Sequence, residues 1–509
     1  MSDDMGWGEP GAFPSTGHAG TRISTPALDE FAKEGLRFTN AYAGYTVCAP
    51  SRTTLMTGRH SGQFVKYGYP GTTLASGAAE TTQMLLQKAG YMTAGVGKMA
   101  PLHDPVPQGF EYFIGQVDQG LCHNMYPRYY DTGARPTGVK PESCSATGFC
   151  NIDLSLNAKI PDNATAARTA CMADPSQYNF TVDITAHHSL AFVADHVAKN
   201  PSQPFFLYEA FTVPHAGGWG KSPNQPESGA PVPSDGEYAS HTDWPEVERD
   251  HAAVITYLDS YVGDLLALLK SLQIDDKTLI FFASDNGAHL EGGHSYHFFN
   301  STGGLLGHKR SLYEGGMRSP TMARWTGTIK PGVSDYAWAF WDFMPTVAEL
   351  SGMTSALPKD IDGISIVPTL MGKVQPPKDY LYWTWDGTGV PPLPAGWTTH
   401  QNKNGLAVYK NTATQVMTST HPAPLAAKRG GTPGYSVRVG DWKGVVPHCD
   451  DEAGKHPSNG DLDTMQVFHL PADPFEKNNL ASTAAGNAKA TEMLGVIMPK
   501  NLTCTCYQC

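Results

Sequence analysis

Hydrophobic residues recur with two different periods along this chain and predict alternating helices and strands. Apolar positions three and four residues apart predict helices over 26–34, 79–89, 182–199 and 252–272. The first helix has Thr25 at its N-cap, Pro26 at its first position and Gly35 just past its end. Continuous apolar runs predict buried strands over 91–96, 204–211 and 277–283. This alternation is typical of an α/β fold with a large, mainly parallel sheet flanked by helices on both faces.

The pattern changes beyond about residue 372. Pro-Pro pairs, a Gly/Thr-rich stretch over 387–399 and a short alternating segment over 435–439 replace the helix and strand alternation. We therefore expect a catalytic domain over 1–373 and a smaller domain with an antiparallel sheet over 374–509.

Composition and charge narrow the class of protein. The 509 residues are 40% hydrophobic and 17% charged, as in a globular protein with a substantial core. The formal net charge of −12, from 36 basic and 48 acidic residues, argues against a nucleic-acid partner. The most apolar helix, 252–272, carries Asp259, Asp264 and Lys270, so we predict a soluble helix and no membrane span.

Cysteines and glycosylation signals indicate a secretory route, with an extracellular, lysosomal or periplasmic destination. The chain has nine cysteines, at 48, 122, 144, 150, 171, 449, 504, 506 and 509. Setting Cys48 aside leaves eight, enough for up to four disulfides, and Asn-x-Ser/Thr sequons occur at 163, 179, 300 and 501. The Cys504, Cys506 and Cys509 tail fits disulfides better than a metal site, because no histidine pair lies nearby.

Two acidic pairs far apart in the sequence suggest a metal site. Asp3-Asp4 lies near one end, and Asp285-Asn286 directly follows the strand predicted over 277–283. Ligands of such sheets gather at the carboxyl ends of the strands. Three carboxylates brought together repel one another unless a cation lies between them, and an oxygen-only set suits Ca²⁺, or less well Mg²⁺, rather than zinc. Taken singly, each pair is more often a solvated chain end or a tight turn.

The segment Cys48-Ala49-Pro50-Ser51-Arg52 carries the most specific signal in the chain. It resembles the sulfatase family's Cys-x-Pro-Ser-Arg site, at which the cysteine is oxidised to formylglycine by a formylglycine-generating enzyme. Further segments resemble that family's motifs in the same order, most closely in its arylsulfatase A-like and N-acetylgalactosamine-6-sulfatase-like branch. They are Asp3–Gly8, Gly97-Lys98, Thr212–Ala216, Ser284–Gly287 and Lys309–Arg318.

The resemblance implies a catalytic role for several of these residues. One hydroxyl of hydrated formylglycine at position 48 is the nucleophile, and the same group joins Asp3, Asp4, Asp285 and Asn286 as a metal ligand. Asp285 also helps to deprotonate the nucleophile. The remaining hydroxyl then loses its proton, and the sulfated intermediate eliminates sulfate to regenerate the aldehyde.

Cationic and imidazole groups complete the implied site. Lys98 and Lys309 bind the sulfate oxygens, because the transition state of an anionic ester needs positive donors. Arg52, four residues after Cys48, lies on the same helical face and holds the aldehyde hydrate and an acidic neighbour. His215 protonates the departing alcohol.

The sequence departs from the family pattern after Lys98. The family often has Gly-Lys-Trp-His, whereas Met99-Ala100 stands here. His123 is our preferred replacement for the absent histidine, and His103 is the alternative. His289 and His294 flank the second acidic pair and fit either the substrate rim or a structural role equally well.

The N-terminus also departs from the pattern. The family has a buried strand before its first Asp-Asp, and only Met1-Ser2 precedes it here. We expect a longer natural N-terminus that carries this strand and a signal peptide.

The resemblance implies a sulfuric ester hydrolase that acts on a sulfated sugar or polysaccharide. A phosphomonoester or phosphonate ester hydrolase on the same scaffold is the alternative among enzymes. An inactive secreted glycoprotein that binds sulfated glycans is the alternative from another class.

Overall fold

The structure is a computed structural model, and its described part covers most of the chain. It comprises residues 1–13, 23–63, 74, 77, 79–102, 104–127, 130–132, 157, 159–161, 163–218, 229–385, 397–401, 407–411, 414, 417–418, 434–447 and 465–501.

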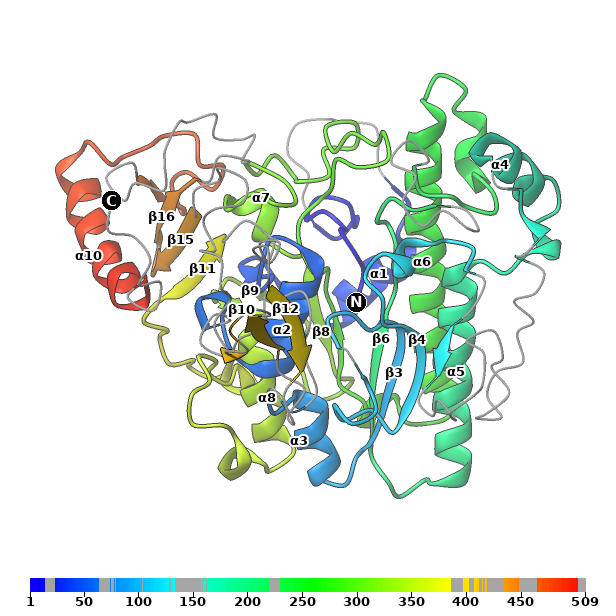
Figure 1. Cartoon of the computed structure of the whole chain (residues 1–509), viewed down its shortest axis with the longest axis horizontal. Coiled ribbons are helices and arrows are strands. Elements are labelled where there is room, and N and C mark those ends of the chain that lie inside the picture. The colour runs from blue at the N-terminus through cyan, green and yellow to red at the C-terminus, as the bar shows by residue number, and fades with distance from the viewer. Residues whose placement is uncertain are drawn as a thin grey trace.

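Two four-stranded sheets form the centre of the larger part of the molecule (Figure 1). The first has the order β5-β4-β3-β6, with β3 parallel to β4 and β6. The second has the order β7-β8-β1-β9, with β8 antiparallel to both neighbours and β9 parallel to β1. Their strands are β1 (Leu36–Phe38), β3 (Met92–Lys98), β4 (Tyr112–Gln116), β5 (Asp131–Thr132), β6 (Phe205–Ala210), β7 (Ile280–Phe282), β8 (Thr321–Arg324) and β9 (Gly332–Ser334).

Helices pack in two groups around these sheets, which confirms the α/β class. One group, α1 (Pro26–Glu34), α5 (Thr181–Lys199) and α6 (Glu246–Ser271), reaches β3 through α5. The other, α2 (Cys48–Thr57), α3 (Thr82–Lys88) and α8 (Phe343–Leu350), reaches β3 through α3. The remaining short elements are β2 (Ala41–Tyr42), β10 (Trp338–Ala339), α4 (Ala164–Ala173), α7 (Glu314–Met317) and α9 (Val367–Leu370).

The first helix has the predicted bounds but a different cap. Thr25 occupies the N-cap of α1, yet its side chain makes no capping bond and instead contacts Asp29 and the Gly11 N–H. The free amides of Ala27 and Leu28 donate to the carboxylate of Asp259 on α6. A carboxylate from another helix therefore accepts the hydrogen bonds that the first N–H groups of α1 cannot make within the helix.

Helix α6 starts at Glu246, six residues before the predicted start. Glu246 and Glu248 occupy its first turn, where acidic side chains complement the helix dipole but interrupt the apolar pattern. Among the described residues, α6 alone has the length and apolar composition of a membrane span. It packs against α1 and α5, as a core helix does.

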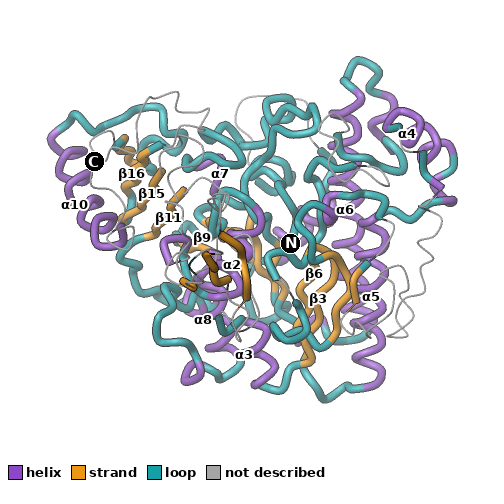
Figure 2. The backbone as a smooth tube through the Cα atoms, viewed as in Figure 1, coloured by secondary structure: helices purple, strands orange, loops and turns teal. Residues whose placement is uncertain are grey.

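The C-terminal part forms its own antiparallel sheet, at the left of Figure 1. Its order is β11-β15-β16-β17, and α10 (Ala484–Asn501) packs on three of these strands. The strands are β11 (Leu381–Trp385), β15 (Gly434–Val439), β16 (Trp442–Val446) and β17 (Gln466–His469). A separate three-stranded sheet consists of β12 (Trp397–Gln401), β13 (Ala407–Asn411) and β14 (Met417–Thr418). Figure 2 shows the strands β11, β15 and β16, in orange, beside the helix α10, in purple.

A buried ion cluster fastens this C-terminal sheet to the larger part. Lys443 on β16 is fully buried, and its Nζ lies 2.9 Å from carboxylate oxygens of both Glu314 and Glu476. Glu314 begins α7 and also pairs with Arg318. One lysine thus neutralises carboxylates from two separate segments.

The first residues of the chain lie between the two central sheets. The Ser2 N–H donates to the Ala283 carbonyl, and the Asp3 N–H donates to the Val213 carbonyl. Strands β6 and β7 are otherwise separated by an apolar cavity of about 560 Å³, which Met1 also lines. The buried α-amino group of Met1 donates to the Glu209 carbonyl at 2.7 Å.

The structure corrects the disulfide expectation for two cysteines. Cys122 and Cys171 are buried free thiols, as is Cys48. The other six cysteines lie outside the described residues, so at most three disulfides can form.

Candidate active site

Cys48 is the first residue of α2, a helix whose ten residues are all buried. Pro50 falls in the first turn, where its missing N–H removes no helical bond. Gly58 ends the helix with φ +68°, a left-handed conformation that glycine adopts without strain. The Cys48 side chain therefore sits at the positive end of a rigid helix.

The other predicted residues reach Cys48 from the carboxyl ends of strands, as expected for an α/β sheet. Lys98 is the last residue of β3, and His215 follows β6 by five residues. Asp285 follows β7 by three residues, and Asp3 pairs beside it through the bridge between Ser2 and Ser284.

Asp3 and Asp285 form one half of a buried charge cluster. The Lys98 Nζ lies 2.6 Å from Asp3 Oδ2, and the Arg52 Nη2 lies 2.7 Å from Asp285 Oδ2. Burial alone would raise the pKa of Asp3, but Lys98 and Arg52 together lower it. Burial and the neighbouring Asp3 raise the pKa of Asp285. Arg52 thus pairs with two of the carboxylates proposed as metal ligands, Asp285 and, at 3.7 Å, Asp3.

Asp4 and Asn286 form the other half. The Lys309 Nζ lies 2.7 Å from Asp4 Oδ2, and Asn286 donates from Nδ2 to Asp4 Oδ1 at 2.7 Å. Asp4 has φ +69°, a strained conformation for a residue with a side chain and one that occurs at functional sites.

These residues fit a hard divalent cation. The Oδ1 atoms of Asp3 and Asn286 are buried without a hydrogen-bond partner. Ligand atoms of Asp3, Cys48 and Asp285 lie within 4.8 Å of one another. Carboxylate and amide oxygens are the donors that Ca²⁺ and Mg²⁺ prefer, so the orphaned oxygens are the expected signature of a cation site.

Two histidines lie against this cluster. The Nε2 of His123 lies 2.9 Å from the Lys98 Nζ, and the His123 ring stacks on His215 with centroids 3.7 Å apart. Burial, together with the charges of His215 and Lys98, lowers the pKa of His123 well below its usual value. The structure thus brings His123 into the site, whereas His103 lies outside the described residues.

Sequence reasoning missed two polar contacts. Gln119 donates from Nε2 to the Cys48 Sγ at 3.0 Å, and it lies three residues beyond the end of β4. Glu291 contacts the Lys309 Nζ at 3.0 Å and the His215 Nε2 at 3.3 Å, and it also pairs with Arg310. In the sequence, the only signal for these two residues is the position of Gln119 just after a strand. Glu291 has no comparable signal.

His289 and His294 do not line a rim. Both are buried, with exposed fractions of 1% and 2%. His289 contacts the Pro214 carbonyl, and its ligand atom and those of Asp4 and Glu291 lie within 4.8 Å of one another. His294 contacts Glu248 on α6, farther behind the site.

Comparisons with known proteins point to one family. The family model described as Sulfatase matches residues 1–353. Human N-acetylgalactosamine-6-sulfatase is 30% identical over 393 residues, which cover 73% of this chain and 65% of the human protein, slightly less than two thirds. Human arylsulfatase A is 30% identical over 417 residues, which cover 75% of this chain and 69% of that protein. A solved sulfatase from Pseudoalteromonas sp. matches with a TM-score of 0.62 at 21% identity, over all of this chain and 90% of that one.

Proposed function

The chain belongs to the sulfatase family, and from this premise we propose that it hydrolyses sulfate monoesters at the site around Cys48. The observation that carries the proposal is the convergence of the Cys48 side chain with two lysines, Lys98 and Lys309, and three carboxylates in one buried cluster. Positive groups held in a dry site stabilise the charge of a sulfuryl transition state far better than they would in water.

The proposed reaction needs two further groups: a formylglycine made from Cys48 and a bound divalent metal ion. Formylglycine made from Cys48 would supply a geminal diol as nucleophile, and a dication on Asp3, Asp4, Asp285 and Asn286 would supply Lewis acidity. We propose Ca²⁺, with Mg²⁺ fitting less well, because all the donors are oxygens.

Lys98 and Lys309 bind and orient the sulfate. Both ammonium groups are fully charged, because neighbouring carboxylates raise the pKa of each lysine above its ordinary value despite the opposing effect of burial. They approach Cys48 from different segments, so they can contact different non-bridging oxygens. The imidazole of His123 accepts a hydrogen bond from Lys98 and fixes the direction of its ammonium group.

His215 is the proposed general acid. Its Nδ1 lies 2.5 Å from the Ala216 carbonyl, which fixes a proton on that nitrogen. Nε2 lies 3.6 Å from Asp4 Oδ2 and 3.3 Å from Glu291 Oε2, and in the protonated form of His215 this nitrogen carries the transferable proton. That proton can pass from Nε2 to the departing alcohol. Asp285 takes up the proton that the nucleophile releases, and Arg52 keeps this carboxylate in place.

We propose a sulfated sugar as substrate, because N-acetylgalactosamine-6-sulfatase is among the relatives over most of the chain. The partner during maturation is a formylglycine-generating enzyme. Since only 5% of Cys48 is exposed, that enzyme must act before the chain folds, which agrees with processing on a secretory route.

The proposal is tested with Cys48→Ala. The variant should lose all measurable turnover of nitrophenyl sulfate while keeping its unfolding midpoint, because the substitution removes only the small reactive group at position 48. Cys171→Ala, which alters another buried free thiol remote from the site, is the matched control and should keep full activity. Substantial activity in Cys48→Ala would refute the nucleophile. Faster turnover of nitrophenyl phosphate by the unaltered protein would favour the phosphoester alternative.

Peptide mass spectrometry across Cys48 distinguishes the enzyme from the remaining alternative, an inactive glycoprotein that binds sulfated glycans. Protein from its native host should carry the aldehyde at position 48. An unconverted thiol in all of that protein would support the glycan-binding alternative instead.

A further inference from the structure

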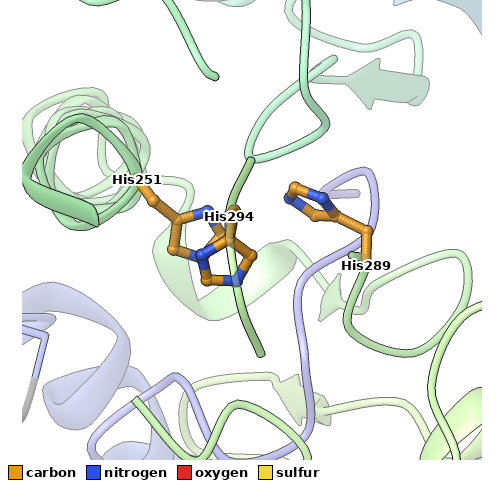
Figure 3. A group of neighbouring side chains, drawn as sticks. All are labelled: His251, His289 and His294. Atoms are coloured by element: carbon orange, nitrogen blue, oxygen red, sulfur yellow. The ribbon is translucent and has the colours of Figure 1, made fainter. Parts of the chain in front are cut away.

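A second group of potential metal ligands lies behind the active-site loop. His251 projects from α6, while His289 and His294 come from the loop that follows Asn286 (Figure 3). One ring nitrogen from each lies within 4.8 Å of the other two. All three side chains are at least 98% buried.

Two of these histidines each bind a buried carboxylate. His251 Nε2 lies 2.7 Å from Glu9 Oε1, and His294 Nδ1 lies 2.7 Å from Glu248 Oε2. A carboxylate accepts, so each of these nitrogens carries the ring proton. The opposite nitrogens, His251 Nδ1 and His294 Nε2, are buried and have no hydrogen-bond partner. Each presents an unused lone pair in the protein interior, which is costly unless something binds it.

His289 follows the same pattern with a backbone acceptor. Its Nε2 donates to the Pro214 carbonyl at 2.9 Å, which leaves the lone pair on Nδ1. That lone pair accepts a hydrogen bond from the backbone N–H of Glu291 at 3.1 Å, and a metal would take the place of this bond. Burial lowers the pKa of His289 well below its usual value, so the ring is neutral.

The ring stacking also indicates that His251 and His294 are not both charged. The rings of His251 and His294 lie nearly parallel with centroids 3.6 Å apart. Two charged rings would repel strongly at this distance in a buried site. Neutral imidazole is the form that binds a metal.

We propose that His251, His289 and His294 form a transition-metal site that takes Zn²⁺, separate from the carboxylate site. Histidines that ligate zinc almost always donate their other ring N–H to a carboxylate or a carbonyl, and all three do so here. Nitrogen donors select zinc over Ca²⁺ and Mg²⁺. Zinc–nitrogen bonds of about 2.0–2.1 Å need ligand atoms within about 4 Å of one another, so binding draws the three rings slightly together.

The bound metal would tie α6 to two segments of the active site. Glu9 belongs to the N-terminal segment that carries Asp4, and its Oε2 also accepts the Gly6 N–H at 2.7 Å. His289 and His294 flank Glu291, which contacts His215 and Lys309. Zinc therefore holds the loop that positions the proposed acid and one sulfate-binding lysine.

The test uses variants that keep each carboxylate bond but remove the ligand atom. In His251→Gln the amide nitrogen replaces Nε2 toward Glu9, and in His294→Asn it replaces Nδ1 toward Glu248. After removal of metal and dialysis against micromolar zinc with excess Ca²⁺, mass spectrometry of the metal should find one zinc per unaltered chain. Each variant should retain less than a tenth of that zinc.

His188→Asn is the matched control. His188 is equally buried, and its Nδ1 lies 3.3 Å from the Tyr112 hydroxyl, a contact that asparagine can keep. This variant should bind as much zinc as the unaltered protein. Equal zinc in all four proteins, or none in the unaltered protein, would overturn the proposal.

Cobalt gives a readout that needs no variant and no activity. Co²⁺ in a low-coordinate histidine site absorbs visible light far more strongly than Co²⁺ in an octahedral oxygen site. The unaltered protein should show the intense bands, and zinc should abolish them while Ca²⁺ does not. Weak octahedral bands alone would refute the histidine site and leave the proposed sulfatase activity untouched.

Discussion

Burial, at the scale of single residues, decides the protonation of several side chains outside the site. His188 on α5 is the clearest case, because burial lowers its pKa to about 4, with a smaller effect of the adjacent His187. The unfolded chain takes up the corresponding proton near pH 6.5. Between these two pH values the unfolded state binds more protons, so the free energy of unfolding falls as the pH falls.

This shift gives a measurable pH dependence. From pH 7 to pH 5 the unaltered protein should lose about 2 kcal/mol of unfolding free energy through His188 alone. Over the same interval, the loss of unfolding free energy in His188→Asn should be smaller by about 2 kcal/mol, whatever the stability of this variant at pH 7. Urea denaturation at both pH values measures the difference, and an identical loss in the two proteins would contradict it.

The acidic residues, Cys48, Arg52 and the two lysines could be named from the sequence, because each stands in a motif that resembles the sulfatase family's. Cys48 also begins a helix, and Lys98 and Asp285 lie at or just after strand ends. Contacts such as Gln119 with Cys48 and Glu291 with His215 were not. They join loops whose paths depend on tertiary packing and leave no periodic signal. His289 and His294 show the same limit, since their sequence neighbours do not reveal that Glu248 and the Pro214 carbonyl enclose them.

Whole elements were predicted best where their ends carry strong local signals. Pro26 and Gly35 bound α1, and the apolar run of β6 lies within the predicted limits. Helix α6 extends beyond its prediction because its polar first turn is stabilised by the helix dipole rather than by an apolar face. The division at residue 373 stays a prediction, although every strand of the C-terminal sheet comes after it.

The ion cluster around Lys443 on β16 is expected to contribute strongly to the free energy of unfolding. Lys443→Met leaves two buried carboxylates, Glu314 and Glu476, without their shared cation. Removing one partner of a buried ion pair costs about 3–5 kcal/mol of unfolding free energy. Thermal or urea denaturation should show this loss.

A lysine on α10 provides the control. Lys489→Met removes an exposed pair with Glu492, which contributes less than about 0.5 kcal/mol. Comparable losses in the two variants would show that the β16 cluster is not specifically stabilising.

At the scale of the whole molecule, the apolar cavity of about 560 Å³ between β6 and β7 is a departure from close packing. Val347 on α8 lines it. Val347→Leu should add a methylene to unfilled space and raise the unfolding free energy by about 0.8 kcal/mol. Val374→Leu makes the same change at a side chain that is 94% exposed, and it should have almost no effect. A destabilised Val347→Leu protein would mean that the cavity has no room for the added group.

The position of Met1 has a practical consequence for handling the protein. Its amino group donates to the Glu209 carbonyl of β6, whose residues line the cavity together with those of β7. An affinity tag or a fluorescent fusion joined to Met1 would replace this amine and begin beside the cavity. Coupling to a surface or dye through Lys489, on the outside of α10, leaves the sheets undisturbed.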